Sequence, residues 1–324
     1  GSPVPGTFAP DQELSAIADA MARAGRGVFE MIPAGTVGKL ERLGGERTTP
    51  EAEVKLMADF SRQSGRKVTF TLVQSPDYAP DTWERLLEMV VTANQTGAQL
   101  YPQVSSRPIG LASGLSGYHA FQRRPTYMKL AHLPLAERAR EMAKPEIKAA
   151  IMSETDVLVD QPGSMANMYQ LFQTAAMFLY PLADPVDYEP DPSEMLGSRA
   201  AATGQDVLDL LYDYLLEQDG AAMCALMGGP NVHDSQEVLR QMLIHPETVT
   251  GLSDAGAHVT LICDATMPTT QLTFWARDRH KGERLPLEFL VAKQTARNAD
   301  LYGLKDRGRL AVGLRADINV IDFE

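Results

Sequence analysis

The stretch Thr248–Val259, T-V-T-G-L-S-D-A-G-A-H-V, places a carboxylate and an imidazole four residues apart, at Asp254 and His258. Strand-forming residues precede Asp254, and Gly256 lets the backbone turn after it. The carboxyl ends of strands in a parallel α/β sheet or barrel are where side chains leave the packed interior and active-site groups collect. The pattern therefore predicts an acid and a base beside one cleft, suited to proton transfer. The structural alternative is that Asp254 caps the turn.

Helical and strand-like patterns alternate before and around this stretch. Apolar residues recur at helical spacing in three segments, and each is followed by a short apolar run typical of a buried strand. We expect helices at 11–24, 50–65 and 82–96, and strands at 27–32, 67–73, 99–104 and from Val249. This rhythm is typical of a parallel sheet with outer helices, in a barrel or a doubly wound sheet. After Ser106 it breaks, and it returns with a helix at 235–244. Within the interval we expect a helix over 138–154 and a short strand at 156–159.

Two motifs carry a resemblance to a known family. G-L-S-D-A-G-A-H resembles the last barrel strand of the metal-dependent amidohydrolase superfamily, most closely the D-aminoacylase or N-acyl-D-amino-acid deacylase branch, amidohydrolase family 3. Gly308–Asp322 resembles the strand pair by which those enzymes enter a small β-sandwich, and Thr295–Ala299, T-A-R-N-A, ends a helix as in the family. The resemblance implies the C-terminal half of a TIM-like (β/α)8 barrel plus part of a β-sandwich.

This resemblance gives a division of the chain. We expect barrel βα units over 3–105, an insertion or lid over the active-site face at 106–234, the last barrel strand and helices over 235–307, and the first sandwich strands over 308–324. Only four core strands are counted where a closed barrel has eight, so the resemblance implies a fragment whose first four strands precede residue 1. Open strand edges favour a homo-oligomer or pairing with a missing N-terminal segment.

The resemblance also implies a reaction. A divalent metal, zinc in the usual case, would supply hydroxide to attack an amide, and Asp254 would bind the metal and carry the proton to the departing amine. The family's H-x-H motif is absent from this sequence, and the strands at 27–32 and 67–73 carry no histidine where the family has one on each. Glu30 is a second, weaker ligand candidate. Most ligands would then lie outside this chain, or this is a branch with altered metal chemistry.

Three residues are candidates for substrate binding. Arg107 follows the strand at 99–104, where a guanidinium could pair with a substrate carboxylate, although a surface role is as plausible. Gln74 ends the strand at 67–73 and would bond either the substrate or the turn. His258 is favoured as a substrate-contacting or supporting residue over a metal ligand.

Composition narrows the classes of partner. A net charge of −12 opposes binding to nucleic acid or anionic lipid, and we expect neither partner. Two cysteines outside any C-x-x-C pattern, with no apolar run approaching the roughly 20 residues of a membrane span, indicate a reducing compartment and a cytoplasmic protein.

Three hypotheses follow. The first is a metal-dependent amidohydrolase that cleaves the C–N bond of N-acyl-D-amino acids or related small amides. The second is a non-catalytic, truncated small-molecule-binding homologue that has lost the metal centre, as the missing histidines suggest. The third is a glycosidase that uses Glu30 and Asp254 as a carboxylate pair.

Overall fold

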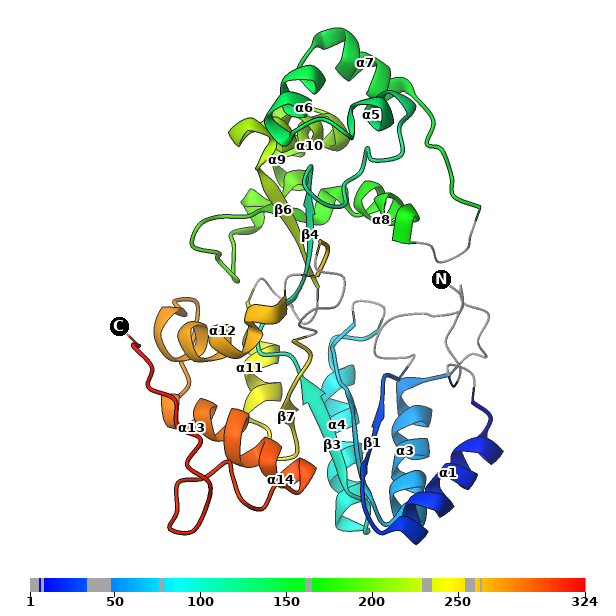
Figure 1. The fold of residues 1–324 in the computed structure, drawn as a ribbon, viewed down its shortest axis with the longest axis vertical. Coiled ribbons are helices and arrows are strands. Elements are labelled where there is room, and N and C mark those ends of the chain that lie inside the picture. Colours follow the sequence, from blue (N-terminus) through cyan, green and yellow to red (C-terminus); the bar gives the residue numbers. More distant parts are fainter. Residues whose placement is uncertain are drawn as a thin grey trace. The chain divides into compact units, whose positions relative to one another are not determined.

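The computed structural model describes Gly6 and residues 9–33, 48–75, 78–160, 165–228, 235–253, 260–262 and 264–323. The chain divides into two compact units. The first unit contains 109–228 with 260–262 and Asp264, and the second contains the remaining described residues. Figure 1 traces the chain through both units. No helix in the described ranges is long and apolar enough to cross a membrane.

A parallel sheet forms the centre of the second unit. Its strands are β1 (Val28–Met31), β2 (Lys67–Thr71), β3 (Leu100–Val104) and β7 (Val249–Thr250), in the order β1-β2-β3-β7. Every neighbouring pair is parallel. Each strand lies beside the next one along the chain, which is the order of a barrel segment, whereas a doubly wound sheet reverses its order part-way. The predicted α/β class with a parallel sheet is confirmed.

The helices of this unit start and stop where local signals place them. Thr49 accepts a hydrogen bond from the amide of Ala52 and Pro50 follows it, so α3 begins as predicted. Gly65 ends α3 in the left-handed conformation. The helices are α1 (Asp11–Ala24), α3 (Pro50–Ser64), α4 (Thr82–Gln95), α11 (Glu237–Ile244), α12 (Met267–Thr273), α13 (Leu287–Ala292) and α14 (Asn298–Tyr302), with π-helical segments η7 (Phe274–Asp278) and η8 (Lys293–Arg297).

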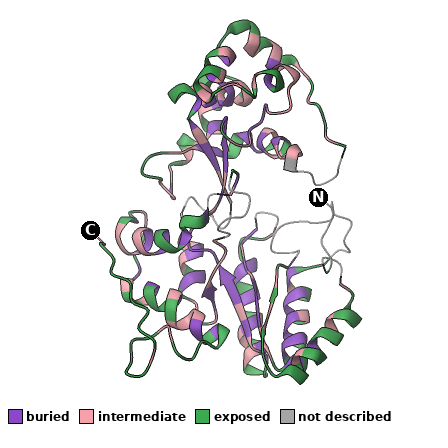
Figure 2. Ribbon diagram, viewed as in Figure 1, coloured by how far each residue is buried: buried purple, intermediate pink, exposed green. Residues whose placement is uncertain are grey.

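Helices cover both faces of the parallel sheet. Phe29 of β1 stacks on Phe60 of α3 with ring centroids 4.1 Å apart, so this face packs against α3. On the opposite face, Lys67 at the start of β2 donates to the backbone carbonyl of Asp300 in α14. Figure 1 shows α3 and α4 on one side of the sheet and α13 and α14 on the other. β2 and β3 are therefore largely buried, whereas β1, at the edge of the sheet, is half-buried with Glu30 exposed. Figure 2 shows buried residues gathered on the central strands and on the inward side of α3.

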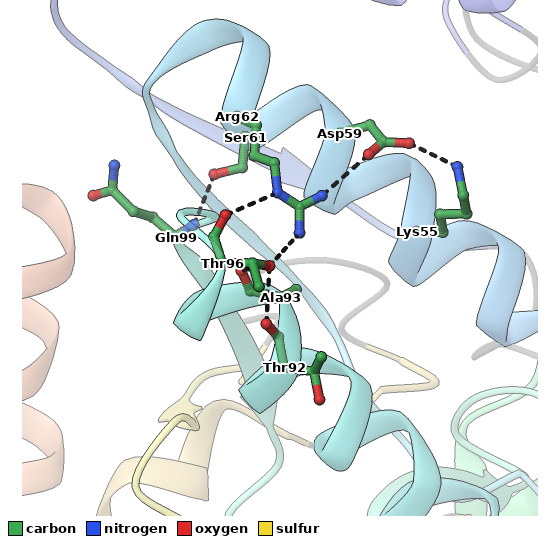
Figure 3. Close-up of polar contacts among 8 residues, drawn as sticks. All are labelled: Lys55, Asp59, Ser61, Arg62, Thr92, Ala93, Thr96 and Gln99. Atoms are coloured by element: carbon green, nitrogen blue, oxygen red, sulfur yellow. Dashed lines mark hydrogen bonds and ion pairs between the residues drawn. The ribbon is translucent and has the colours of Figure 1, made fainter.

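A polar cluster fastens α3 and α4 to the amino end of β3 (Figure 3). Arg62 donates to Asp59 within α3 and, across to α4, to the hydroxyl of Thr96 at 2.8 Å. Ser61 accepts from the amide of Gln99 at 2.8 Å, just before β3 begins. These bonds fix where β3 enters the sheet, and hence where its carboxyl end emerges.

The first unit is built around a small antiparallel sheet. Its strands are β4 (Ile109–Gly114), β5 (Leu179–Pro181) and β6 (Met223–Gly228), in the order β4-β6-β5. Its helices are α5 (Pro125–Leu130), α6 (Leu135–Met142), α7 (Pro145–Ser153), α8 (Tyr169–Thr174), α9 (Leu196–Thr203) and α10 (Val207–Leu216), with 3₁₀ turns η2 (Met165–Asn167), η3 (Ala176–Phe178), η4 (Pro192–Glu194) and η5 (Gln218–Gly220). Phe121, Tyr212 and Leu215 lie in its continuous apolar core. Its role as a lid stays a prediction.

Two predictions of secondary structure are wrong. The strand expected at 156–159 is irregular, because Arg123 and Asn167 bond its backbone in place of a partner strand. The alternating segment 309–322 also contains no strand, and its apolar residues Val312 and Val320 are fully exposed. Within the described residues no sheet lies beside this segment to accept its backbone bonds, and an isolated strand or hairpin is marginal in water.

Candidate functional site

The carboxyl ends of β3 and β7 lie side by side and enclose a cavity. Val104 pairs with Thr250, and the amide of Gly251 donates to the carbonyl of Val104 at 3.1 Å. The cavity has a volume of about 220 Å³ and is lined by Ser106, Thr250, Gly251, Ser253, Met267, Pro268, Gln271, Gln294 and Asn298. Ser253 directly precedes Asp254. Asp254 and His258 themselves lie outside the described residues.

The backbone that leads to Asp254 is strained. Leu252 has a φ of 67°, in the left-handed region that favours glycine. A Cβ on the preceding Gly251 would lie 2.3 Å from Oε1 of Gln103, so any larger residue there would force the Gln103 side chain to shift. Residues held in such conformations cluster at active sites and ligand-binding loops. The strand thus ends in a strained backbone conformation, two residues before the predicted catalytic carboxylate.

Arg107 is buried at the carboxyl end of β3. Its Nη1 donates to the carbonyl of Pro108 at 2.9 Å, and its Nη2 donates to Oγ1 of Thr266 at 3.1 Å. Thr266 ends the 3₁₀ turn η6 (Asp264–Thr266). The guanidinium therefore ties the end of β3 to η6 within the part that the structure describes, which differs from the exposed surface arginine considered as the alternative.

Gln74 is also buried, after the end of β2. Its Nε2 donates to the carbonyls of Ser75 and Ala79, and its Oε1 accepts from the amide of Trp83 at 3.1 Å. The side chain thereby fixes the turn into α4. This geometry matches the turn-capping alternative, and substrate binding by Gln74 stays a prediction.

Glu30 lies on β1, on the sheet face opposite to the one that packs against α3. Its Oε1 accepts a hydrogen bond from Nε2 of Gln103 at 2.9 Å, and the carboxylate is exposed. Gln103 thus contacts both Glu30 and the site of Gly251, and it links the middle of β1 to the end of β7. A path of contacts thus crosses the sheet from Glu30 through Gln103 to Gly251.

A tryptophan that sequence reasoning did not single out fixes the cavity wall. Nε1 of Trp275 donates to the carbonyl of Ser106 at 2.6 Å, and Oγ of Ser106 donates to the carbonyl of Met267 at 2.8 Å. The buried guanidinium of Arg279 lies over the Trp275 ring, 4.9 Å from its centroid. This set holds η7 and α12 against the end of β3. No local sequence signal marks it, because its partners lie some 160 residues apart in the chain.

A family model for amidohydrolases matches residues 5–324. The chain belongs to the amidohydrolase family. Imidazolonepropionase from Paracoccus denitrificans (strain Pd 1222) is 33% identical over 145 residues, which is 43% of this chain and 36% of that protein. N-acyl-D-glutamate deacylase from Alcaligenes xylosoxydans xylosoxydans is 54% identical over 44 residues, 14% of this chain and 9% of that protein. The second match supports the D-aminoacylase branch.

Solved structures of two such enzymes are similar to this amidohydrolase chain. N-acyl-D-glutamate deacylase from Bordetella bronchiseptica, complexed with zinc and a phosphonate inhibitor, shows 16% identity and a TM-score of 0.46. A D-aminoacylase crystal structure shows 15% identity and a TM-score of 0.45. Each similarity covers 97% of this chain and 50% of the other. The chain thus spans about half the length of these proteins, and its assignment rests on the family match.

The described part of this amidohydrolase chain does not form a metal site. No group of three or more His, Cys, Asp or Glu side chains within the described ranges could hold a metal ion. A zinc site ordinarily takes three or four such ligands. The described residues therefore do not fit a metal, and the metal roles of Asp254 and Glu30 stay predictions.

Lys293 in η8 is a second residue that the sequence analysis missed. It is 3% exposed, and its Nζ donates to the carbonyls of His245 and Thr248 and to Oγ1 of Thr248, at 3.2, 2.7 and 2.8 Å. Burial, with a smaller contribution from Arg297, lowers the pKa of Lys293 to about 7. The lysine locks η8 to the turn that enters β7. An apolar helix with one lysine gives no sign of this contact.

Proposed function

We propose that this chain serves hydrolysis of the amide C–N bond of N-acyl-D-amino acids or related small amides. The observation that carries the proposal is the family match over residues 5–324. The cavity at the carboxyl ends of β3 and β7, one residue before Asp254, supports it, since this edge of a barrel is where such enzymes act. The 54% local identity to an N-acyl-D-glutamate deacylase favours an acidic D-amino acid as the first substrate to test.

Asp254 is the proposed proton carrier of the reaction. Amide hydrolysis needs a base for the attacking water and an acid for the departing amine, and one carboxylate can take the proton from the first and pass it to the second. The imposed backbone at Leu252 and Gly251 would set where that carboxylate lies. In this proposal His258 and Arg107 help to bind the substrate, and Gln74 shapes the loop beside them.

A divalent metal is the cofactor expected for the whole protein, and zinc is the metal that the family resemblance implies. It would supply an activated water at neutral pH. The described residues do not form a ligand set for it. Metal content per chain, measured without added metal, tests the expectation directly.

The Asp254→Asn variant tests the proposed function. We expect its kcat/KM on N-acetyl-D-glutamate to fall by about 10²- to 10⁴-fold, the usual contribution of a positioned acid or base. Asp317→Asn is the matched control, because Asp317 is exposed and its ion pairs lie on the surface. Wild-type turnover in Asp254→Asn, with an unchanged control, would show that the carboxylate has no catalytic role.

The second candidate function is binding of a small molecule without catalysis. It is favoured by the sequence, which lacks the H-x-H motif and the two strand histidines of the family, and by the hydrogen bond that engages Glu30 with Gln103. This hypothesis predicts that N-acyl-D-amino acids bind to the purified protein and are recovered intact. Release of free D-amino acid that is abolished in Asp254→Asn would exclude it.

A further inference from the structure

Two side-chain amides on the wall of the 220 Å³ cavity have unused hydrogen-bonding capacity. Gln271 of α12 is 1% exposed, and its Nε2 has no hydrogen-bond partner within the described residues. The buried Oδ1 of Asn298, at the start of α14, has no partner there either. Two residues that line the cavity therefore each carry one buried polar atom with unused capacity, a donor on Gln271 and an acceptor on Asn298. Buried polar atoms in native proteins are normally satisfied, so such a pair indicates a ligand or water.

The other half of each amide is already bonded. Oε1 of Gln271 accepts from Nε2 of Gln294 at 3.0 Å, and Nε2 of Gln294 also donates to the carbonyl of Pro268 at 2.6 Å. Nδ2 of Asn298 donates to the carbonyl of Gln294 at 3.5 Å. Gln294 thus contacts both side chains and holds them near each other. These bonds orient Gln271 as a donor and Asn298 as an acceptor.

The remaining lining residues define the chemistry of the site. None of the nine residues that line this cavity is charged, and Ser106, Thr250 and Ser253 contribute hydroxyl-bearing side chains. A carboxylate would find no cation among these described residues and could not donate to Oδ1 of Asn298, and an ammonium could not accept from Nε2 of Gln271. A neutral carboxamide satisfies both atoms, since its carbonyl accepts and its N–H donates.

We propose that this cavity binds a neutral carboxamide group, with the ligand carbonyl accepting from Gln271 and the ligand N–H donating to Asn298. The cavity is smaller than the roughly 300 to 1,000 Å³ usual for whole small-molecule ligands, so it suits one group of a larger molecule. Its role as a substrate subsite rests on the proposed amide hydrolysis. The binding itself is measurable without turnover.

Titration of the purified protein with two small probes, followed by NMR, tests the proposal. Propionamide offers a carbonyl and an N–H, whereas butanone has the same shape with a carbonyl alone. We expect wild type to bind propionamide about five- to tenfold more tightly than butanone, as one additional satisfied hydrogen bond gives. Equal binding of the two probes, or no binding of either, would overturn the proposal.

Two variants test whether Nε2 of Gln271 binds the probe carbonyl and Oδ1 of Asn298 binds the probe N–H. Gln271→Met keeps the side-chain volume and removes the donor, so it weakens both probes by a similar factor. Asn298→Leu removes the acceptor, so it lowers propionamide affinity to that of butanone. The comparison of the two probes in the wild type remains decisive even where a variant fails to fold. Unchanged affinities in both folded variants would refute the assignment.

The outcome separates this site from the proposed function. Preferential propionamide binding by a protein that releases no D-amino acid would contradict the proposed hydrolysis and support the cavity assignment. Hydrolysis by a protein that shows no preference between the probes would support the proposed hydrolysis and contradict the cavity assignment.

Discussion

Replacing Lys293 by methionine should remove a pH dependence from the stability of the second unit. Methionine keeps the length and apolar stem of the side chain but cannot bind a proton. In the wild type the pKa of Lys293 is lowered to about 7 by burial, against an ordinary value of 10.5. Two effects oppose each other at Nζ. Burial disfavours the ammonium, whereas the three oxygen atoms around it favour it.

The sign of the effect follows from proton counting. Between pH 7 and 10.5 the unfolded chain keeps a proton on Lys293 that the folded chain has released, so the free energy of unfolding rises with pH in this window. From pH 7.5 to 8.5 the folded lysine is mostly neutral and the unfolded one is fully charged. The expected gain is about 1.2 kcal/mol over that interval. As pH falls toward 7 this contribution is lost.

Chemical denaturation at pH 7.5, 8.0 and 8.5 measures how steeply the free energy of unfolding rises with pH. Trp83 and Trp275, the two tryptophans of the chain, both belong to the second unit, so their fluorescence follows its unfolding. Lys293→Met should lose about 1.2 kcal/mol of the pH-dependent gain, whereas Lys305→Met, at an exposed position, should retain it. Identical slopes in wild type and Lys293→Met would show that the surrounding carbonyls keep the buried ammonium charged.

Three further predictions concern the same elements and the first unit. Gly251→Ala should lower the free energy of unfolding by about 1–3 kcal/mol, because its Cβ would displace Gln103, and an unchanged denaturation midpoint would contradict this. Trp275→Phe leaves the carbonyl of Ser106 without its donor and should cost about 1–3 kcal/mol, more than Trp83→Phe in the same assay. Burial and Arg138 lower the pKa of His119 to about 3, so its ring protons should show no NMR titration between pH 7 and 4. Because the unfolded histidine binds a proton below pH 6.5, this group should lower the stability of the first unit as pH falls, by about 1.4 kcal/mol per pH unit between 6 and 4.

The parallel sheet and its helices were predictable because their signals are local. Thr49 and Pro50 start α3 and Gly65 ends it, and each signal acts within one helical turn. The apolar runs at β2 and β3 identify strands buried on both faces. In the first unit the signals are weaker. The helix expected over 138–154 is divided, because Pro145 begins α7 after α6 has ended at Met142.

The candidate site was predictable in position but not in detail. The motif at 251–254 indicated the strand end, and the cavity lies there. The polar wall was not predictable, because Gln271 and Asn298 meet only when α12 and α14 fold back on the end of β7. Arg107 was found as a candidate, but its burial depends on Thr266, far along the chain. Tertiary contacts of this kind have no signature in a local window.

The pairing of β3 with β7 sets an order of events during synthesis. Gln103 pairs with Val249, 146 residues later, and most of the first unit lies between them. A ribosome working at about 5–20 residues per second therefore leaves the edge of β3 open for on the order of ten seconds while residues 109–228 emerge and can collapse into their own core. The time taken to synthesise the first unit therefore delays the second, whose sheet and cavity cannot be completed before β7 has been synthesised.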